Sequence, residues 1–96
     1  MKIKVKFYLS SKLTGINEDE LNMELEKEIF LEEFLNLLGE KYPVFGKNFI
    51  YSLGARGDAK MARIPLLIMI NNKYSGLKQT IKQGDVIEIF LFAAGG

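Results

Sequence analysis

The sequence predicts one α+β domain in which a mixed sheet of four to five strands packs one face on a single main helix. Three observations lead to this prediction. Apolar and polar residues alternate at 2–9 and 21–25, the period changes to that of an amphipathic helix at 29–41, and two β-forming apolar runs follow at 66–70 and 86–92. With 96 residues, the chain forms one domain, residues 1–96, around one core.

The first two strands are expected to form an antiparallel hairpin. Apolar residues take every second position at 3–9 and again at 21–25, and turn-forming residues separate the two stretches. The positions between them carry mostly lysine in the first strand and asparagine or glutamate in the second. Cross-strand charge pairs on this polar face would contribute roughly 0.2–1 kcal/mol each.

Residues 29–41 predict the main helix. Glu32 and Glu33 suit the positive end of its dipole, and Gly39 and Tyr42-Pro43 mark its end. Its apolar residues recur at helical spacing and are interpreted as core. This predicted stripe consists of Phe30, Leu31, Phe34, Leu35, Leu37 and Leu38.

Periodicity fades from 44 to 64, where we expect a flexible insertion. A structureless connection of this length is uncommon in a compact domain unless it has a function or is mobile. We expect residues 49–53 to fold back on the core. The glycine-punctuated basic stretch at 54–63 is either a solvated loop or a basic lip for an acidic or phosphate-bearing partner.

The second half of the chain supplies the remaining strands. The apolar run at 66–70 predicts a central strand, and Asn71-Asn72 predicts a tight turn, because both residues tolerate positive φ, into a short strand at 73–75. Gly84-Asp85 predicts another turn before the last strand at 86–92. The first and last strands are expected to be the central parallel pair.

Composition excludes several kinds of chemistry. The chain has no cysteine and no histidine, so disulfides, thiolate zinc sites, iron–sulfur clusters and a cysteine nucleophile are excluded, and we expect no metal site. A net charge of +1 argues against nucleic acid as a partner. No apolar run approaches the ~20 residues of a membrane span, so we expect a cytoplasmic protein that binds neither nucleic acid nor membrane.

The end of the chain is the one stretch that suggests chemistry. Ala93, Ala94, Gly95 and Gly96 follow the last strand, and we expect residues 93–96 to be a mobile tail. Glycines lack Cβ and take φ of either sign, so this end could thread a narrow channel and bring its carboxylate into another protein's active site. The alternative is a frayed end without a function.

An apolar patch is predicted beside this tail. If the odd-numbered residues of the last strand point into the core, alternation places Phe90 and Phe92 on the opposite face with Val86 and Glu88. Leu67 and Met69 lie outward by the same argument. The predicted patch, Phe90, Phe92, Leu67 and Met69, is either a docking surface or is covered by the insertion.

The closing residues resemble those of a known family: Gly84-Asp85, Ile87, Ile89, Phe90, and the tail Ala93-Ala94-Gly95-Gly96. Residues 67–72 also resemble that family's strand ending in an asparagine turn. With this order of elements, the chain resembles the ubiquitin-like β-grasp and, within it, the small subunit of molybdopterin synthase and its relatives, the MoaD/ThiS-like sulfur carriers. Leu91 and Phe92 stand where that family commonly has two prolines.

The resemblance implies a sulfur carrier that is not an enzyme by itself and binds no cofactor. An E1-like adenylating enzyme would use ATP to activate Gly96, a sulfurtransferase would supply the sulfur, and the resulting thiocarboxylate would serve the molybdopterin synthase large subunit. Phe90 would pack against that subunit. Three alternatives stay open: a ubiquitin-like protein modifier, a sulfur carrier for tRNA thiolation or thiamine synthesis, and a binding module whose tail is irrelevant.

Overall fold

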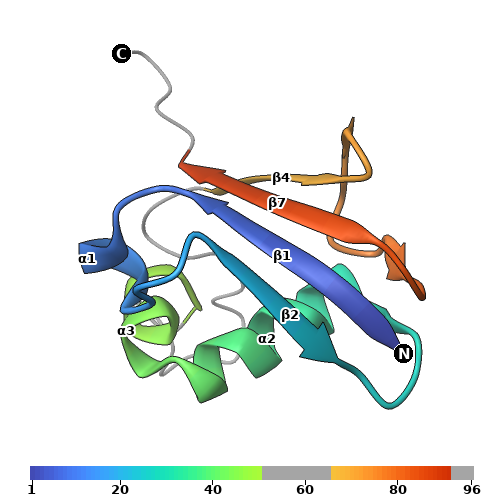
Figure 1. The fold of residues 1–96 in the computed structure, drawn as a ribbon, viewed down its shortest axis with the longest axis horizontal. Helices are drawn as coiled ribbons and strands as arrows, with labels where there is room; N and C mark the ends of the chain where they lie inside the picture. Colours follow the sequence, from blue (N-terminus) through green and yellow to red (C-terminus); the bar gives the residue numbers. More distant parts are fainter. Residues whose placement is uncertain (51–65, 92–96) are drawn as a thin grey trace.

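A five-stranded mixed sheet lies across the main helix in the computed structural model, which describes residues 1–50 and 66–91 (Figure 1). The strand order is β2–β1–β7–β4–β5, and a second sheet pairs β3 with β6. The strands are β1 (Lys2–Tyr8), β2 (Glu20–Glu24), β3 (Ile29–Phe30), β4 (Leu66–Ile70), β5 (Lys73–Tyr74), β6 (Thr80–Ile81) and β7 (Val86–Leu91). The helices are α1 (Ser11–Thr14), α2 (Leu31–Lys41), α3 (Pro43–Phe45) and the π-helical turn η1 (Gly46–Ile50). The predicted α+β architecture is confirmed.

The pairing of the strands follows the alternation in the sequence. β1 pairs antiparallel with β2, with Lys2 opposite Glu24 and Lys6 opposite Glu20. β1 also pairs parallel with β7 at the centre of the sheet, so both the hairpin and the central parallel pair are confirmed. Lys4 forms an ion pair with Glu20 at 3.2 Å on the exposed face, a contact that contributes at most ~1 kcal/mol in this setting.

The core lies between the sheet and α2. Ile87 and Ile89 of β7 and Phe34 and Leu38 of α2 are fully buried. Two residues of the predicted stripe differ: Phe30 and Leu37 are 41% and 46% exposed. Phe30 is extended and precedes the helix, and Leu37 lies roughly 110° around α2 from the centre of the buried stripe at ~100° per residue.

The connection before β6 caps the start of α2. Leu31 and Glu32 donate backbone N–H groups to the carbonyls of Gln79 and Leu77, at 2.8 and 3.0 Å. The Glu33 carboxylate accepts from the Phe30 N–H at 2.9 Å. These contacts satisfy backbone donors that a helix leaves unpaired at its first turn, so the connection holds α2 in place under the sheet.

The first part of the predicted insertion at 44–64 is helical. α3 and η1 extend through Ile50, and Phe45 and Phe49 are fully buried with ring centroids 5.1 Å apart. Phe49 therefore packs in the core as expected, whereas 44–50 is not the irregular segment that the sequence predicted. Pro43 and Gly46 interrupt the helical spacing of apolar residues in this segment, so the sequence pattern does not predict a helix. The prediction for residues 51–64 lies outside the described residues.

The side chain of one asparagine connects two turns of the chain by hydrogen bonds. Asn71 and Asn72 have φ of 53° and 69°, as the turn prediction requires, and Gly84 has φ of 84°. The Asn71 side chain donates to Asp85 Oδ1 at 2.8 Å and accepts from the Val86 N–H at 2.9 Å. The turn after β4 is thereby fixed against the turn before β7.

Replacing Asn71 with glycine should lower the free energy of unfolding by about 1–2 kcal/mol, because glycine keeps the positive φ and loses both side-chain hydrogen bonds. Asn71→Ala should cost about 1 kcal/mol more, since alanine disfavours positive φ. Urea unfolding measures both changes. Asn72→Gly is the matched control, and it should stay within about 0.5 kcal/mol of the wild type. Equal stability of Asn71→Gly and the wild type would contradict the stabilising role of these side-chain hydrogen bonds.

Candidate functional site

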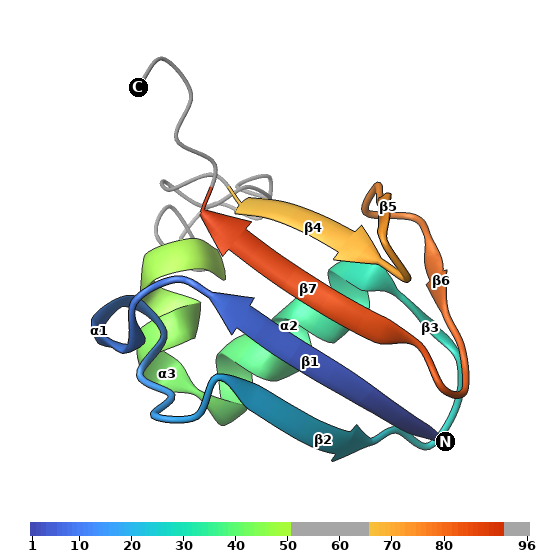
Figure 2. The ribbon, with the colours of Figure 1, turned by 45° about the horizontal axis from the view of Figure 1, so that its top comes forward.

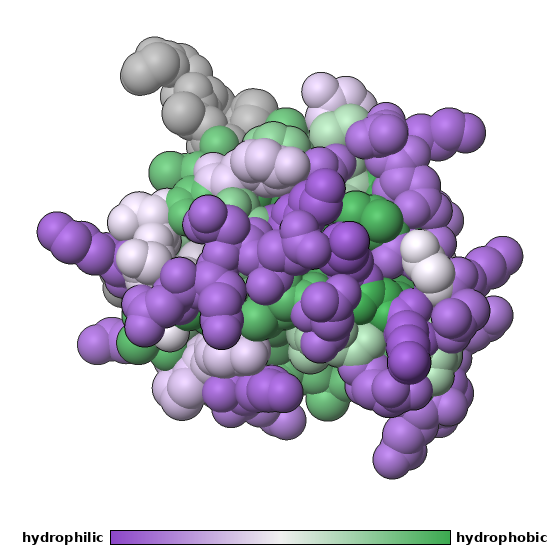
Figure 3. Space-filling model, viewed as in Figure 1, coloured by the Kyte–Doolittle hydropathy of each residue, from purple (hydrophilic) through white to green (hydrophobic). Residues whose placement is uncertain are grey.

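The face of the sheet opposite α2 is covered by none of the described elements (Figure 2). Apolar and aromatic side chains of β1, β4, β5 and β7 gather there around one carboxylate. Figure 3 shows hydrophobic residues at this place, over the carboxyl end of β7, bordered by hydrophilic ones. We call this surface the outer-face patch; it consists of Tyr8, Leu67, Met69, Tyr74, Glu88 and Phe90.

The strand register brings these residues together in two rows. Phe90 is the cross-strand partner of Tyr8 on one side and of Leu67 on the other. In the next row, Met69 is the partner of Glu88 and also of Tyr74. Tyr74 is 74% exposed, while Leu67, Met69 and Phe90 are half-buried.

Three of the predicted patch residues lie as the sequence predicted. Phe90, Leu67 and Met69 are on the outer face, while Ile68, Ile70, Ile87 and Ile89 point to the core. Leu91 differs, since it is 38% exposed at the end of β7 instead of buried. It pairs with Leu66 at the last position of the sheet, where burial by neighbours ends. Phe92, Ala93, Ala94, Gly95 and Gly96 lie outside the described residues.

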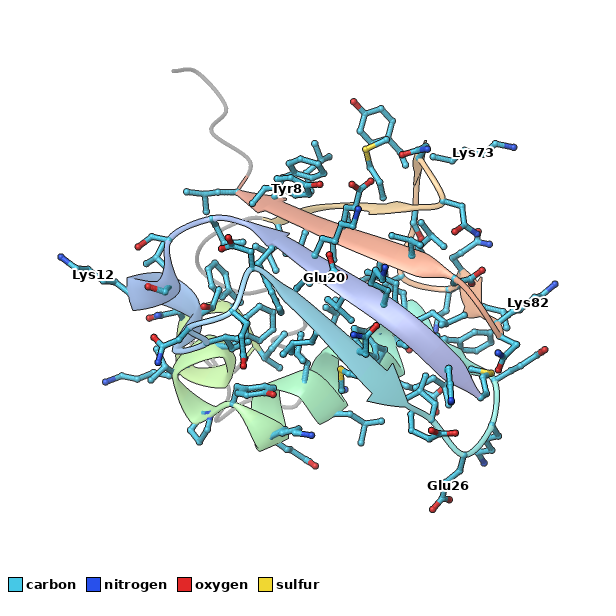
Figure 4. All side chains as sticks on the ribbon, viewed as in Figure 1. Tyr8, Lys12, Glu20, Glu26, Lys73 and Lys82 are labelled. Atoms are coloured by element: carbon cyan, nitrogen blue, oxygen red, sulfur yellow. The ribbon has the colours of Figure 1, made fainter. Side chains whose placement is uncertain are left out.

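Tyr8 is a member of the patch that sequence reasoning did not single out. Its ring stacks on that of Phe90, with centroids 4.6 Å apart and planes 6° apart. Its hydroxyl donates to Glu88 Oε2 at 2.9 Å. Figure 4 shows Tyr8 projecting above the sheet near the end of β7. Two sequence predictions together could have identified Tyr8. It takes a polar-face position of the first strand, and the first strand was expected to pair in parallel with the last.

The hydrogen bond from Tyr8 to Glu88 has an electrostatic consequence. This hydrogen bond, followed by desolvation and by the negative charges of Glu88 and Glu20, raises the pKa of the Tyr8 phenol above its usual value of 10.0. The phenol is therefore protonated at neutral pH and acts as a donor. Its contribution to stability is complete below pH ~10 and is lost as the pH rises through the raised pKa.

Titration of the Tyr8 ring by NMR should give a pKa above that of an exposed tyrosine, and Glu88→Gln should bring it back towards about 10. Glutamine keeps an acceptor oxygen but removes the negative charge that strengthens the hydrogen bond and favours the protonated phenol. Tyr8→Phe identifies the signal. A Tyr8 pKa that Glu88→Gln leaves unchanged would contradict the hydrogen bond.

The described residues offer little side-chain chemistry. Across 1–50 and 66–91, no three carboxylates gather closely enough to hold a metal ion. In the same part of the chain, no helix has the length and apolar character needed to cross a membrane. The polar groups of the outer-face patch are Tyr8, Tyr74 and Glu88.

Comparison with known proteins places this geometry among small ubiquitin-like proteins. A family model described as the ThiS family matches residues 10–96, and no curated protein sequence matches the chain. The small archaeal modifier protein 1 (SAMP1) from Methanosarcina acetivorans is 25% identical with a TM-score of 0.67, covering 99% of this chain and 96% of that chain. A putative molybdopterin converting factor, subunit 1, from Pyrococcus furiosus is 24% identical with a TM-score of 0.67, covering 96% and 98%.

A third similar structure is a protein–protein complex of subunits 1 and 2 of molybdopterin-converting factor from Helicobacter pylori 26695. It is 20% identical with a TM-score of 0.56, and the match covers 100% of both chains. These likenesses confirm the predicted ubiquitin-like β-grasp fold.

Proposed function

Because the chain belongs to the ThiS family of ubiquitin-fold sulfur carriers, we propose that it carries sulfur as a thiocarboxylate on Gly96 for molybdopterin synthesis. The observation that carries the proposal is the position of the outer-face patch. Phe90 lies one residue before the end of β7, and the diglycine follows in sequence. A protein that covers the patch is thereby in reach of the tail.

The proposed chemistry needs only the carboxylate of Gly96 from this chain. With a pKa of ~3.5, that group is ionised at neutral pH. In an adenylating enzyme its oxygen attacks the α-phosphate of ATP, pyrophosphate leaves, and an acyl adenylate forms. Hydrosulfide (HS⁻) then attacks the carbonyl carbon, AMP and one proton leave, and the thiocarboxylate remains. Gly95 and Gly96 present no side chain to the enzyme during these steps.

The globular part positions the tail. Five residues follow Leu91, and an extended chain of that length spans at most ~18 Å. The enzyme must therefore bind close to the end of β7. Aromatic residues such as the half-buried Phe90 and the exposed Tyr8 are typical anchors of such contacts, because each buries a large rigid ring at low entropic cost.

Single-turnover sulfur transfer tests the assignment to molybdopterin. The thiocarboxylated protein is mixed with a molybdopterin synthase large subunit and the pterin precursor, and both the pterin and the carrier are analysed by mass spectrometry. The proposal expects sulfur in the pterin and a carrier returned to its carboxylate. Sulfur that moves only to tRNA or to the thiazole precursor in parallel reactions would contradict the molybdopterin assignment.

A protein modifier is the second candidate, supported by the 25% identity to SAMP1 from Methanosarcina acetivorans. In this case the activated carboxyl group of Gly96 would be joined to a lysine of a target protein. Cells that express the tagged chain would then accumulate high-mass species with isopeptide links, and removal of Gly96 would abolish them. Their absence, while thiocarboxylate is present, would favour the carrier.

A further inference from the structure

Glu88 is the one carboxylate inside the outer-face patch. It lies between Met69 on β4 and Lys6 on β1 in the register of the sheet, next to the stacked rings of Tyr8 and Phe90. Its side chain is half-buried. Any protein that docks on the patch must therefore cover this charged group.

The bonding of Glu88 is incomplete within the described residues. Oε2 accepts the Tyr8 hydroxyl at 2.9 Å, while no ion pair among residues 1–50 and 66–91 includes Glu88. Lys6 is its register partner, but it lies between Glu88 and Glu20 and is not within ion-pair distance of either. Glu20 instead pairs with Lys4. Within residues 1–50 and 66–91, the other carboxylate oxygen of Glu88 has no hydrogen-bond or ion-pair partner.

Docking would remove the water around this carboxylate. An ionised carboxylate that loses its hydration without gaining a cation or further donors is strongly destabilising. Met69 and Phe90 are apolar, the Tyr8 hydroxyl is already used, and Lys6 on β1 also faces Glu20. A cation from the partner would offset the loss directly.

On the basis of the proposed function, we propose that the sulfur-accepting enzyme places an arginine side chain on Glu88 and against the Tyr8–Phe90 stack. A guanidinium group suits this place better than an ammonium group. It is planar, stacks on aromatic faces and donates to a carboxylate in a fixed geometry. Tyr8 is 49% exposed and lies beside Glu88, so one guanidinium can contact the ring and the carboxylate together.

Tyr8 then acts as a positioning residue. Its hydroxyl holds Oε2, which leaves the other oxygen for the partner's guanidinium group. The charge of Glu88 also makes docking selective, because a partner with an apolar or acidic group at this point would bury an unpaired carboxylate. The ion pair between Glu88 and the partner's arginine therefore determines which enzymes can bind the outer-face patch.

The experiment measures the dissociation constant between the full-length chain and the large subunit at low and at physiological salt. Glu88→Gln should weaken binding by at least about tenfold and flatten the salt dependence, because the ion pair is lost. Glu24→Gln is the matched control, since it removes an equal charge from a side chain that is 69% exposed on the edge strand β2. It should leave binding unchanged.

Phe90→Ala separates this inference from the proposed function. If Phe90→Ala weakens binding but Glu88→Gln binds as tightly as wild type with the same salt dependence, the arginine contact is overturned and the docking face stands. If the wild type does not bind, or Phe90→Ala binds as tightly as wild type, docking through the patch fails and the arginine contact fails with it. Circular dichroism of each variant verifies the fold.

Discussion

Replacing Phe34 with alanine should lower the free energy of unfolding by about 3–5 kcal/mol. Phe34 lies in the middle of α2, is fully buried, and belongs to the core that joins the helix to β1 and β7. Truncation would lose the free energy gained by moving the ring from water into the core, and it would leave a cavity under the central strands. Since a domain of this size is stable by about 5–15 kcal/mol, the variant should be marginal or unfolded at ambient temperature.

Leu37→Ala is the matched control on the same helix. Leu37 is three residues further along α2 and 46% exposed, so its truncation should change stability by at most about 0.5 kcal/mol. Urea unfolding followed by circular dichroism measures both variants. Equal losses at Phe34 and Leu37 would contradict the way α2 faces the sheet.

Removal of Gly95 and Gly96 should reduce adenylation to the background rate. The truncated chain ends in Ala94, which lacks the reacting carboxyl group of Gly96 and carries a Cβ where the proposed channel takes glycine. ATP–pyrophosphate exchange with the adenylating enzyme measures the loss. The unfolding midpoint should not change, because the described core ends at β7.

A glycine substitution elsewhere provides the control for this truncation. At Gly76 an added Cβ would meet nothing within 4 Å, so Gly76→Ala should keep both the exchange rate and the stability. Full exchange by the truncated chain would contradict the role of the diglycine. Equal loss in Gly76→Ala would show that the assay reports on the fold instead.

The longer strands and the main helix could be predicted from the sequence, because each contains enough residues for its pattern of apolar positions to repeat. Alternation at 3–9 and 21–25 gave the hairpin, and Asn71-Asn72 gave a turn with positive φ. β3 and β6 were missed, since each has two residues and no period. They form because the backbone beside the start of α2 pairs with the connection before β7, which is a tertiary effect.

The candidate site was predicted in part. Alternation put Phe90, Leu67 and Met69 on one face, as observed. It could not give the register between β1 and β7, so the stack of Tyr8 on Phe90 and the hydrogen bond to Glu88 appeared only in the structure. The functional roles of Phe92 and residues 93–96 stay predictions.

The intact mass of the protein after reaction with its adenylating enzyme, ATP and a sulfur source tests whether Gly96 becomes a thiocarboxylate. We expect a gain equal to the exchange of one oxygen for one sulfur, and tandem mass spectrometry should place that sulfur in the fragment that ends at Gly96. An unchanged mass with a competent enzyme, or sulfur on any other fragment, would contradict it.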